Sequence, residues 1–349
     1  MPRKILKGGK PMRNTKKWLV FLLCAVMLVS NLGITAMATE NPAPLELDFF
    51  PGDDRGSLIV DILATESQIV ADGRLVVTYD PEAVTYVGTE IGTAWSDADK
   101  VTLSDNAKDG KVILAFASAE AAADGILFRL RFSGAVGHTQ IGLTGSDSYI
   151  SGSGSVPTMG GEYCPSDRFV DMKGMLPEIH EAVDYMTAMY YMNGMSKTMF
   201  GPNVELNRAM MVTILYRIAG EPEVSGTSAF VDVPDGEFYT DPVIWATGNG
   251  ITNGLDSRHF APGKSLSRQE MVTFLYRFAG VMGYDRTATT DLSAYTDADK
   301  VQPYAVQAFQ WAVASGVVNG TSETTLSPEA FTTRAQICIM VRRLLVQQD

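Results

Sequence analysis

Residues 267–280 read "SRQEMVTFLYRFAG" and residues 207–220 read "NRAMMVTILYRIAG", with nine of the fourteen positions identical. A third, more divergent copy, "TRAQICIMVRRLLV", occupies residues 333–346. Apolar side chains recur at i, i+3, i+4 and i+7 in each copy, which predicts an amphipathic helix with one buried face. A pattern that returns at a fixed interval indicates a repeat architecture, so we expect three copies of one structural unit.

The surroundings of this helix repeat as well. A glycine lies 14 residues before the first arginine of every copy, and the segments "FVD", "FVD" and "YTD" place an aspartate 37, 36 and 37 residues before it. An Asn-Gly pair includes each glycine, and we expect it to close the preceding helix. A unit of roughly 60 residues buries too little apolar surface to fold alone, so the three should pack on one another. The repeated positions are Asp171, Asp232 and Asp297 and Gly194, Gly254 and Gly320.

The first arginine of each copy is unusual for a structural helix. Arg208, Arg268 and Arg334 follow Asn207, Ser267 and Thr333, which are good N-caps, so each arginine falls at the first helical position. The helix dipole disfavours a cation there by about 0.3–1 kcal/mol. One interpretation is an anion site, in which guanidinium and helix start both face a carboxylate or phosphate. The other is a salt bridge to the aspartate that opens the same unit.

Aromatic residues recur in the first helix of each unit, at Tyr185, Trp245 and Trp311. They are expected to pack in the core, and the alternative is a platform on which a sugar ring stacks beside the arginine. The predicted helical units cover residues 169–220, 228–280 and 293–346, and together they predict an all-α assembly.

The segment 45–150 has a different period. "ILFRLRF" (126–132) alternates apolar and charged residues, and further segments of this kind are separated by Gly, Asp and Pro. This pattern predicts short antiparallel strands that form a β-sandwich. Residues 151–168, "SGSGSVPTMGGEYCPSDR", are rich in Gly, Ser and Pro and are predicted to be a linker.

The start of the sequence predicts export. Lys16 and Lys17 precede an apolar run from Trp18 to Val29 and then Ala36-Met37-Ala38, so residues 1–38 are expected to be a signal peptide. The run is shorter than the roughly 20 residues that span a bilayer, and we expect no membrane span in the mature chain. Loss of seven positive charges in this segment takes the net charge from −12 to −19. A chain this acidic is not expected to bind nucleic acid or an anionic membrane.

Nothing in the sequence predicts catalysis. The three histidines are far apart in the sequence, and no Ser-His-Asp or Cys-His arrangement has supporting context. We therefore expect a protein that is not an enzyme and has no cofactor and no metal site. Cys164 and Cys338 are too few for a disulfide framework; a single bridge between them stays open, although Cys338 on a helix face is expected to be a small buried apolar residue.

The pattern "FVDV…WATGNGITNG…F.PG.SLSRQEMVTFLYRFAG" resembles the S-layer homology domain, present three times between about residues 169 and 346. The resemblance implies an assembly that holds a secreted protein to a secondary cell-wall polysaccharide of a Gram-positive-type wall, often one that bears pyruvate. Where the family has Thr-Arg-Ala-Glu, this chain has Asn-Arg-Ala-Met, Ser-Arg-Gln-Glu and Thr-Arg-Ala-Gln. The residues that we expect to bind the polysaccharide are Arg208, Arg268, Arg334, Asp171, Asp232, Asp297, Trp245, Trp311, Gly254 and Gly320.

The N-terminal segment is similar to a cohesin domain, through "LVVTYDPEAVTYVG", "GKVILAFAS" and "GILFRLRFSG". That resemblance implies a nine-stranded jelly-roll sandwich with a face for dockerin-bearing secreted enzymes that degrade polysaccharides. The expected function is a cell-surface anchor at the cell wall or S-layer. The alternative is a structural S-layer component or glycan-binding adhesin, in which the sandwich binds sugar or acts as a spacer.

Overall fold

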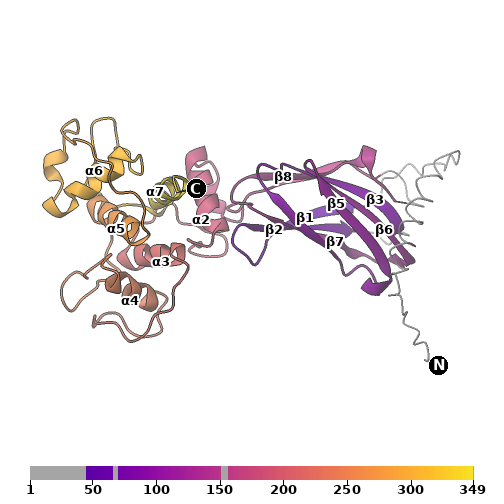
Figure 1. Cartoon of the computed structure of the whole chain (residues 1–349), viewed down its shortest axis with the longest axis horizontal. Coiled ribbons are helices and arrows are strands. Elements are labelled where there is room, and N and C mark those ends of the chain that lie inside the picture. The colour runs from indigo at the N-terminus through magenta and orange to yellow at the C-terminus, as the bar shows by residue number, and fades with distance from the viewer. Residues whose placement is uncertain (1–44, 66–69, 151–155, 349) are drawn as a thin grey trace, which may run out of the picture.

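The computed structural model describes residues 45–65, 70–150 and 156–348, so the predicted signal peptide lies outside the described residues. The chain forms two parts, a β-sandwich and a group of helices, which lie side by side along the long axis of the molecule (Figure 1). Helix α2 (Pro177–Ala188) is the helix nearest to the sandwich, and the C-terminal end of the chain lies beside it.

The β-part consists of two antiparallel sheets. One has the strand order β1-β2-β7-β4, and the other has the order β10-β8-β3-β6-β5, with β9 paired to β3. Alternating residues such as Leu58, Val60 and Ile62 point inward and are fully buried, as the period of two requires. The strands are β1 (Leu45–Pro51), β2 (Ser57–Ala64), β3 (Val70–Tyr79), β4 (Thr85–Ile91), β5 (Val101–Lys108), β6 (Lys111–Ala122), β7 (Gly125–Ser133), β8 (Thr139–Leu143), β9 (Tyr149–Ile150) and β10 (Met159–Tyr163).

The predicted linker is shorter than expected. Strand β10 lies within residues 151–168 and pairs antiparallel with β8, with Met159 opposite Leu143. The sandwich therefore extends to Tyr163, and it has ten strands in the described residues where the cohesin resemblance implies nine. Glycines at 160 and 161 looked like linker residues, but a short edge strand tolerates them because a single neighbouring strand fixes its backbone.

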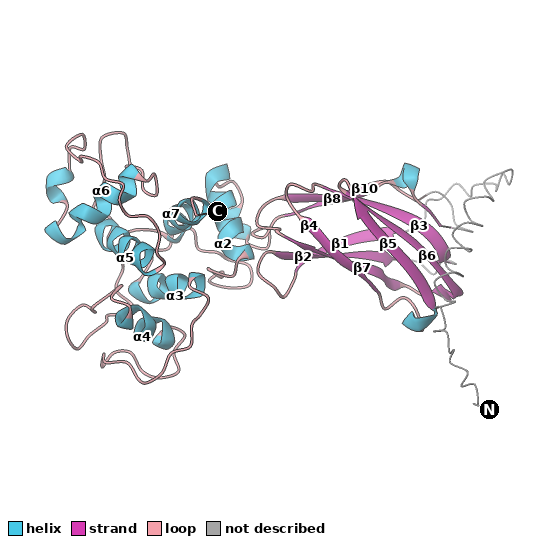
Figure 2. Cartoon of the chain, in the orientation of Figure 1, coloured by secondary structure: helices cyan, strands magenta, loops and turns pink. Residues whose placement is uncertain are grey.

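The helical part is built from pairs of helices that come from different repeats. Helix α3 packs against α4, and α5 packs against α6, so the second helix of each repeat contacts the first helix of the next repeat. Helix α7 packs against α2, which closes the third repeat on the first (Figure 2). Apolar residues of all three repeats belong to one continuous core. The helices after α2 are α3 (Arg208–Ile218), α4 (Thr240–Gly248), α5 (Arg268–Val281), α6 (Val306–Ala314) and α7 (Arg334–Val346).

A ring of three backbone hydrogen bonds joins the repeats at their centre. The N–H of Leu206 donates to the carbonyl of Thr332 (2.8 Å), that of Leu266 to Leu206 (2.9 Å), and that of Thr332 to Leu266 (3.1 Å). Each residue is at most 1% exposed, so these polar groups have little contact with water. Each of the three groups satisfies the next, which removes the penalty for burying unpaired backbone.

Extended segments flank this ring, so the prediction of an all-α assembly is wrong. Isolated β-bridges pair Glu205 with Thr333, Asn207 with Ser265, and Ser267 with Phe331. Long loops without helix also separate the two helices of every repeat. The helical periodicity predicts each helix correctly, but it contains no information on the extended residues that precede the second helix and pair between repeats.

Candidate functional site

The three arginines lie at the junctions between repeats. Each is the first residue of α3, α5 or α7, and the preceding Asn207, Ser267 and Thr333 cap their helices through the side chain, which confirms the predicted helix starts. Capping boxes are present at α5 and α7, as predicted. The arginines are only 4–5% exposed, because each helix start is inserted into the loop of the following repeat. The N–H of Arg208, for example, donates to the carbonyl of Lys264.

The guanidinium groups also hydrogen-bond to the loop of the following repeat. Arg208 donates from Nε to the carbonyl of Phe260 (2.7 Å) and from Nη2 to Oγ1 of Thr252 (3.2 Å), both in the second repeat. Its guanidinium also lies over the Phe260 ring, 4.7 Å from the centroid. Arg334 makes the equivalent contacts with the first repeat, donating to the carbonyls of Phe200 (3.0 Å) and Asn193 (2.6 Å).

Arg268 is the least satisfied of the three. It donates from Nη2 to the carbonyl of Asn319 (2.5 Å), while its Nε is buried without a hydrogen-bond partner. At the position equivalent to Phe200 and Phe260 the third repeat has Leu326, which offers no aromatic face to the guanidinium. The junction between the second and third repeats therefore has unused donor capacity.

Burial dominates the electrostatics of these junctions. Loss of hydration lowers the pKa of Arg208 and Arg334 below the usual range, and it lowers the pKa of Arg268 to about 10. Within the described part of the chain, no carboxylate lies within ion-pair distance of any of the three. A buried cation without a counter-ion is costly, and an anion that reaches it is correspondingly stabilised.

The opening aspartates act within their own repeats. Asp232 accepts hydrogen bonds from the backbone N–H groups of Phe260 and Ala261 (both 2.8 Å), and it does not pair with an arginine. These bonds fold the loop back on the start of the repeat and hold the carbonyl of Phe260 where Arg208 reaches it. Asp171 and Asp297 bind the equivalent backbone groups in the first and third repeats.

The glycines of the Asn-Gly pairs lie beneath the aromatic ring that opens each repeat. A Cβ on Gly254 would be 2.4 Å from Cε1 of Phe230, and the residue has a φ of +82°. A Cβ on Gly194 would be 2.4 Å from Cε1 of Phe169, whereas one on Gly320 would be 3.2 Å from Cε1 of Tyr295 and 2.2 Å from the carbonyl oxygen of Ser322. The expectation that these glycines close a helix is wrong, since α4 ends at Gly248, six residues earlier. Their role is to allow a close approach of ring and loop.

The repeated aromatic residues belong to the core of the helical part. Trp245 is 7% exposed and packs against Tyr216, and Trp311 is 2% exposed and donates from Nε1 to the carbonyl of Asp285 (3.1 Å). Tyr185 is half-buried near Tyr191. The structure thus brings each arginine together with the loop of the next repeat, and it places both indoles inside the protein.

The two faces of the sandwich differ in chemistry. On the β1-β2-β7-β4 sheet, Arg129 forms a two-point ion pair with Asp61 (2.7 Å), and Arg131 pairs with Glu90 (2.8 Å), so both of these arginines are already paired. On the opposite sheet, the small outward residues Ala115 and Ala117 of β6 lie opposite Arg74 and Asp72 of the central strand β3. A hollow of about 530 Å³ lies over this sheet, lined by residues that include Thr78, Gln140, Gly142 and Gly160.

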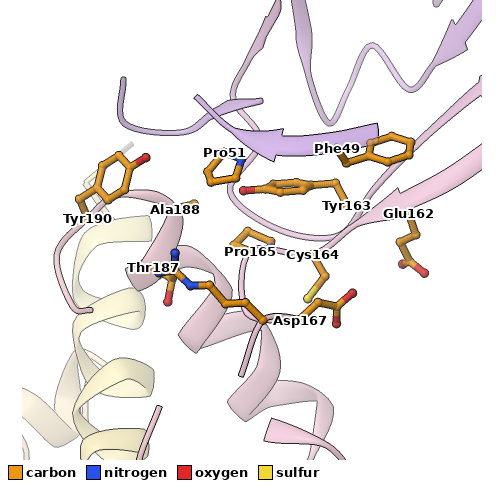
Figure 3. A pocket seen from close by; sticks show the side chains of 11 residues that line it. Phe49, Pro51, Glu162, Tyr163, Cys164, Pro165, Asp167, Thr187, Ala188 and Tyr190 are labelled. Carbon is orange, nitrogen blue, oxygen red and sulfur yellow. The ribbon is translucent and has the colours of Figure 1, made fainter. Parts of the chain in front are cut away.

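A second cavity lies where the two parts of the chain meet, and the sequence analysis missed it. It has a volume of about 220 Å³, and Figure 3 shows Phe49, Pro51 and Tyr163 of the sandwich on one side and Thr187, Ala188 and Tyr190 of the first repeat on the other. No motif marks this place, because its residues are distant in sequence. Both cysteines are free and buried, so they do not form the disulfide that the sequence left open.

Comparison with known proteins identifies the helical part. Residues 168–210, 229–272 and 294–338 match the family model of the S-layer homology domain. The chain therefore contains three S-layer homology domains, which together form the closed ring of repeats described above.

Two curated relatives each match a little under half of the chain. The surface-layer 125 kDa protein of Lysinibacillus sphaericus is 31% identical over 172 residues, which are 48% of this chain and 14% of the relative. The cellulosome-anchoring protein of Acetivibrio thermocellus is 24% identical over 159 residues, which are 44% of this chain and 35% of the relative. The chain thus spans well under half the length of these relatives.

Solved structures similar to the sandwich include the sixth cohesin of scaffoldin B from Acetivibrio cellulolyticus, determined in complex with a Cel5 dockerin variant. The match has 16% sequence identity and a TM-score of 0.28, and it covers 34% of this chain and 97% of the cohesin chain.

We predict that Gly254→Ala destabilises the helical part. The new methyl group would clash with Phe230 and force a left-handed backbone on alanine, at a cost of about 1–2 kcal/mol for the backbone alone. Thermal unfolding followed by helical circular dichroism measures the effect. Gly248→Ala is the control, because its Cβ would meet no atom within 4 Å and alanine favours the helix. Equal melting temperatures for the two variants would contradict the packing role of Gly254.

We also predict that Arg208→Ala weakens the junction between the first two repeats. It leaves the buried carbonyl of Phe260 without its guanidinium donor, and an unsatisfied buried group costs about 1–3 kcal/mol. Chemical unfolding should show this loss, whereas Arg258→Ala, which removes the same charge from an exposed side chain, should change stability by less than about 0.5 kcal/mol. A neutral Arg208→Ala would show that the junction does not depend on this side chain.

Proposed function

We propose that this protein is a non-catalytic anchor at the cell surface, in which the three S-layer homology domains bind a cell-wall polysaccharide and the sandwich presents a docking face. The match to three such domains is the observation on which the proposal rests. Anchoring modules need shape and a binding group but no catalytic machinery. The described residues also include no helix that is long and apolar enough to cross a membrane.

The polysaccharide is proposed to bind through an anionic group at the junctions between repeats. Three buried guanidinium groups without a carboxylate partner provide a repeated positive field at these places. A carboxylate such as that of ketal-linked pyruvate would supply the missing charge and accept hydrogen bonds in a planar geometry. The junction at Arg268 is the preferred place, because that guanidinium has the fewest protein partners.

The sandwich is proposed to bind dockerin-bearing secreted enzymes through the β10-β8-β3-β6-β5 sheet. The resemblance to cohesins suggests the partner, and the chemistry of the face suggests the place. Outward residues such as Ala115 and Ala117 are small, so a helix can approach this sheet closely. On the opposite sheet, Arg129 and Arg131 are already paired internally, so these two charges gain less from a partner.

A second candidate is a structural S-layer component or a glycan-binding adhesin. The similarity to a surface-layer protein and the shallow hollow over the β3-β8-β10 edge favour it. In that case the same sheet would bind sugar in place of a protein.

We predict that Arg268→Lys reduces sedimentation of the chain with purified cell walls more than Arg208→Lys does. Lysine keeps the positive charge but loses the planar fork, and Arg208 already uses Nε and Nη2 within the protein. Helical circular dichroism controls for folding. Binding should also fall when ketal-linked pyruvate is removed from the walls. Equal wall binding by the wild type and both variants would argue against the junction as the anion site.

We predict that Ala115→Arg abolishes capture of dockerin modules by the full chain. The substitution places a long charged side chain in the middle of the sheet, opposite Arg74 of β3. Val87→Arg is the matched control, since it adds the same charge at a 62% exposed position on the opposite sheet. Capture that survives Ala115→Arg but not Val87→Arg would assign the docking face to the other sheet, and capture of glycan alone would favour the adhesin.

A further inference from the structure

The sandwich and the first repeat are joined by direct contacts as well as by the chain. The backbone N–H of Gly56 donates to the carbonyl of Ala188 (2.9 Å), and the hydroxyl of Tyr190 donates to the carbonyl of Gly52 (2.6 Å). Arg55 donates to the carbonyl of Arg217 (3.0 Å). The end of helix α2 therefore packs on the β1–β2 turn of the sandwich.

Four side chains with metal-binding atoms meet at this interface. His138 comes from the loop before β8, Cys164 directly follows β10, and His180 and Asp184 lie one turn apart on α2. One ligand atom from each of the four lies within 4.8 Å of all the others. The group contains a buried thiol and a fully buried carboxylate, whereas His138 stays accessible at the rim.

Asp184 has an unsatisfied oxygen that points into this group. Its Oδ1 accepts hydrogen bonds from the backbone N–H of Ser166 (3.0 Å) and the thiol of Cys164 (3.2 Å). Its Oδ2 is buried and has no hydrogen bond, with Nε2 of His138 at 3.3 Å. Asp184 is 0% exposed, and burying a carboxylate with one oxygen that has no hydrogen bond costs free energy of folding. Unpaired buried groups of this kind indicate a missing ligand or ion.

A second carboxylate orients His138. Its Nδ1 lies 2.7 Å from Oε1 of Glu162 on β10, an exposed hydrogen bond at the edge of the group. When Nδ1 carries the proton, Nε2 is unprotonated and has a free electron pair, and Nε2 is the nitrogen that faces Asp184. Metal-binding histidines in proteins commonly have this outer carboxylate partner, which fixes the ring and raises its basicity.

We propose that His138, Cys164, His180 and Asp184 bind one zinc(II) ion, which cross-links the sandwich to the first S-layer homology domain. Two imidazoles, one thiolate and one carboxylate are ligands that zinc accepts in a tetrahedral site, and four protein ligands are typical of a structural site without catalysis. Calcium and magnesium prefer oxygen ligands and would not use the thiol and imidazoles. Binding would release the thiol proton of Cys164 to solvent.

The alternative at this place is a metal-free ion pair. A protonated His138 would lie between Glu162 and Asp184, both within salt-bridge distance. That arrangement gives Cys164 and His180 no part in the charge balance, whereas the zinc site uses all four residues. The sequence predicted no metal because the ligands are spaced by 26, 16 and 4 positions, which fits no known motif.

Metal content tests the proposal on the full chain lacking residues 1–38. After incubation with zinc chloride and extensive dialysis, the protein should retain one equivalent of zinc, measured by inductively coupled plasma mass spectrometry. Cobalt(II) in place of zinc should produce an intense visible spectrum of tetrahedral type with a thiolate-to-cobalt charge-transfer band. His180→Ala and Cys164→Ser should each reduce zinc affinity by more than the 10–100-fold typical of lost outer-shell contacts.

The control is His259→Ala, since His259 is exposed in the second repeat and pairs with Asp256. It should retain one equivalent of zinc and the cobalt spectrum. Absence of bound zinc in the wild type, a cobalt spectrum without the thiolate band, or equal zinc binding by the wild type and His180→Ala would each overturn the proposal. The first of these outcomes would assign the interface to the histidinium ion pair.

Discussion

The ring of hydrogen bonds through Leu206, Leu266 and Thr332 is the constraint on which the helical part depends. Its donors and acceptors come from three different repeats, so no repeat can satisfy them alone. Every N–H and carbonyl of the three ring residues is used within the ring, so all three repeats are needed to satisfy these groups. The packing of the second helix of each repeat against the next repeat follows from this closure.

The buried arginines follow from the same ring. A helix begins two residues after each ring residue. The ring therefore places the start of that helix in the loop of the next repeat. Arg208 therefore contacts carbonyls of its neighbour rather than water or the aspartate of its own repeat. The unfavourable position of a cation at a helix N-terminus is offset by carbonyl acceptors and aromatic faces, which the sequence does not display as partners.

Much of this fold could be predicted from periodicity and spacing. The helix starts at Arg208, Arg268 and Arg334, their caps, and most of the sandwich strands follow from local patterns. What could not be predicted depends on contacts between distant residues. The β-bridges between repeats, the pairing of Met159 with Leu143 in β10, and the aspartates that bind loop backbone in place of an arginine have no local signature. Likewise, no spacing rule relates His138 to His180.

The interface between the two parts matters because an anchor transmits force. If the repeats hold the wall and the sandwich holds a partner, any pull passes through the short segment after Tyr163 and through the contacts of α2 with the β1–β2 turn. A few backbone hydrogen bonds resist such a load weakly, because each contributes only about 0.5–1.5 kcal/mol net. Covalent or metal cross-links are stronger, and in the described residues both cysteines are free. A cross-link at Cys164 and Asp184 would therefore reinforce the contact through which this load passes.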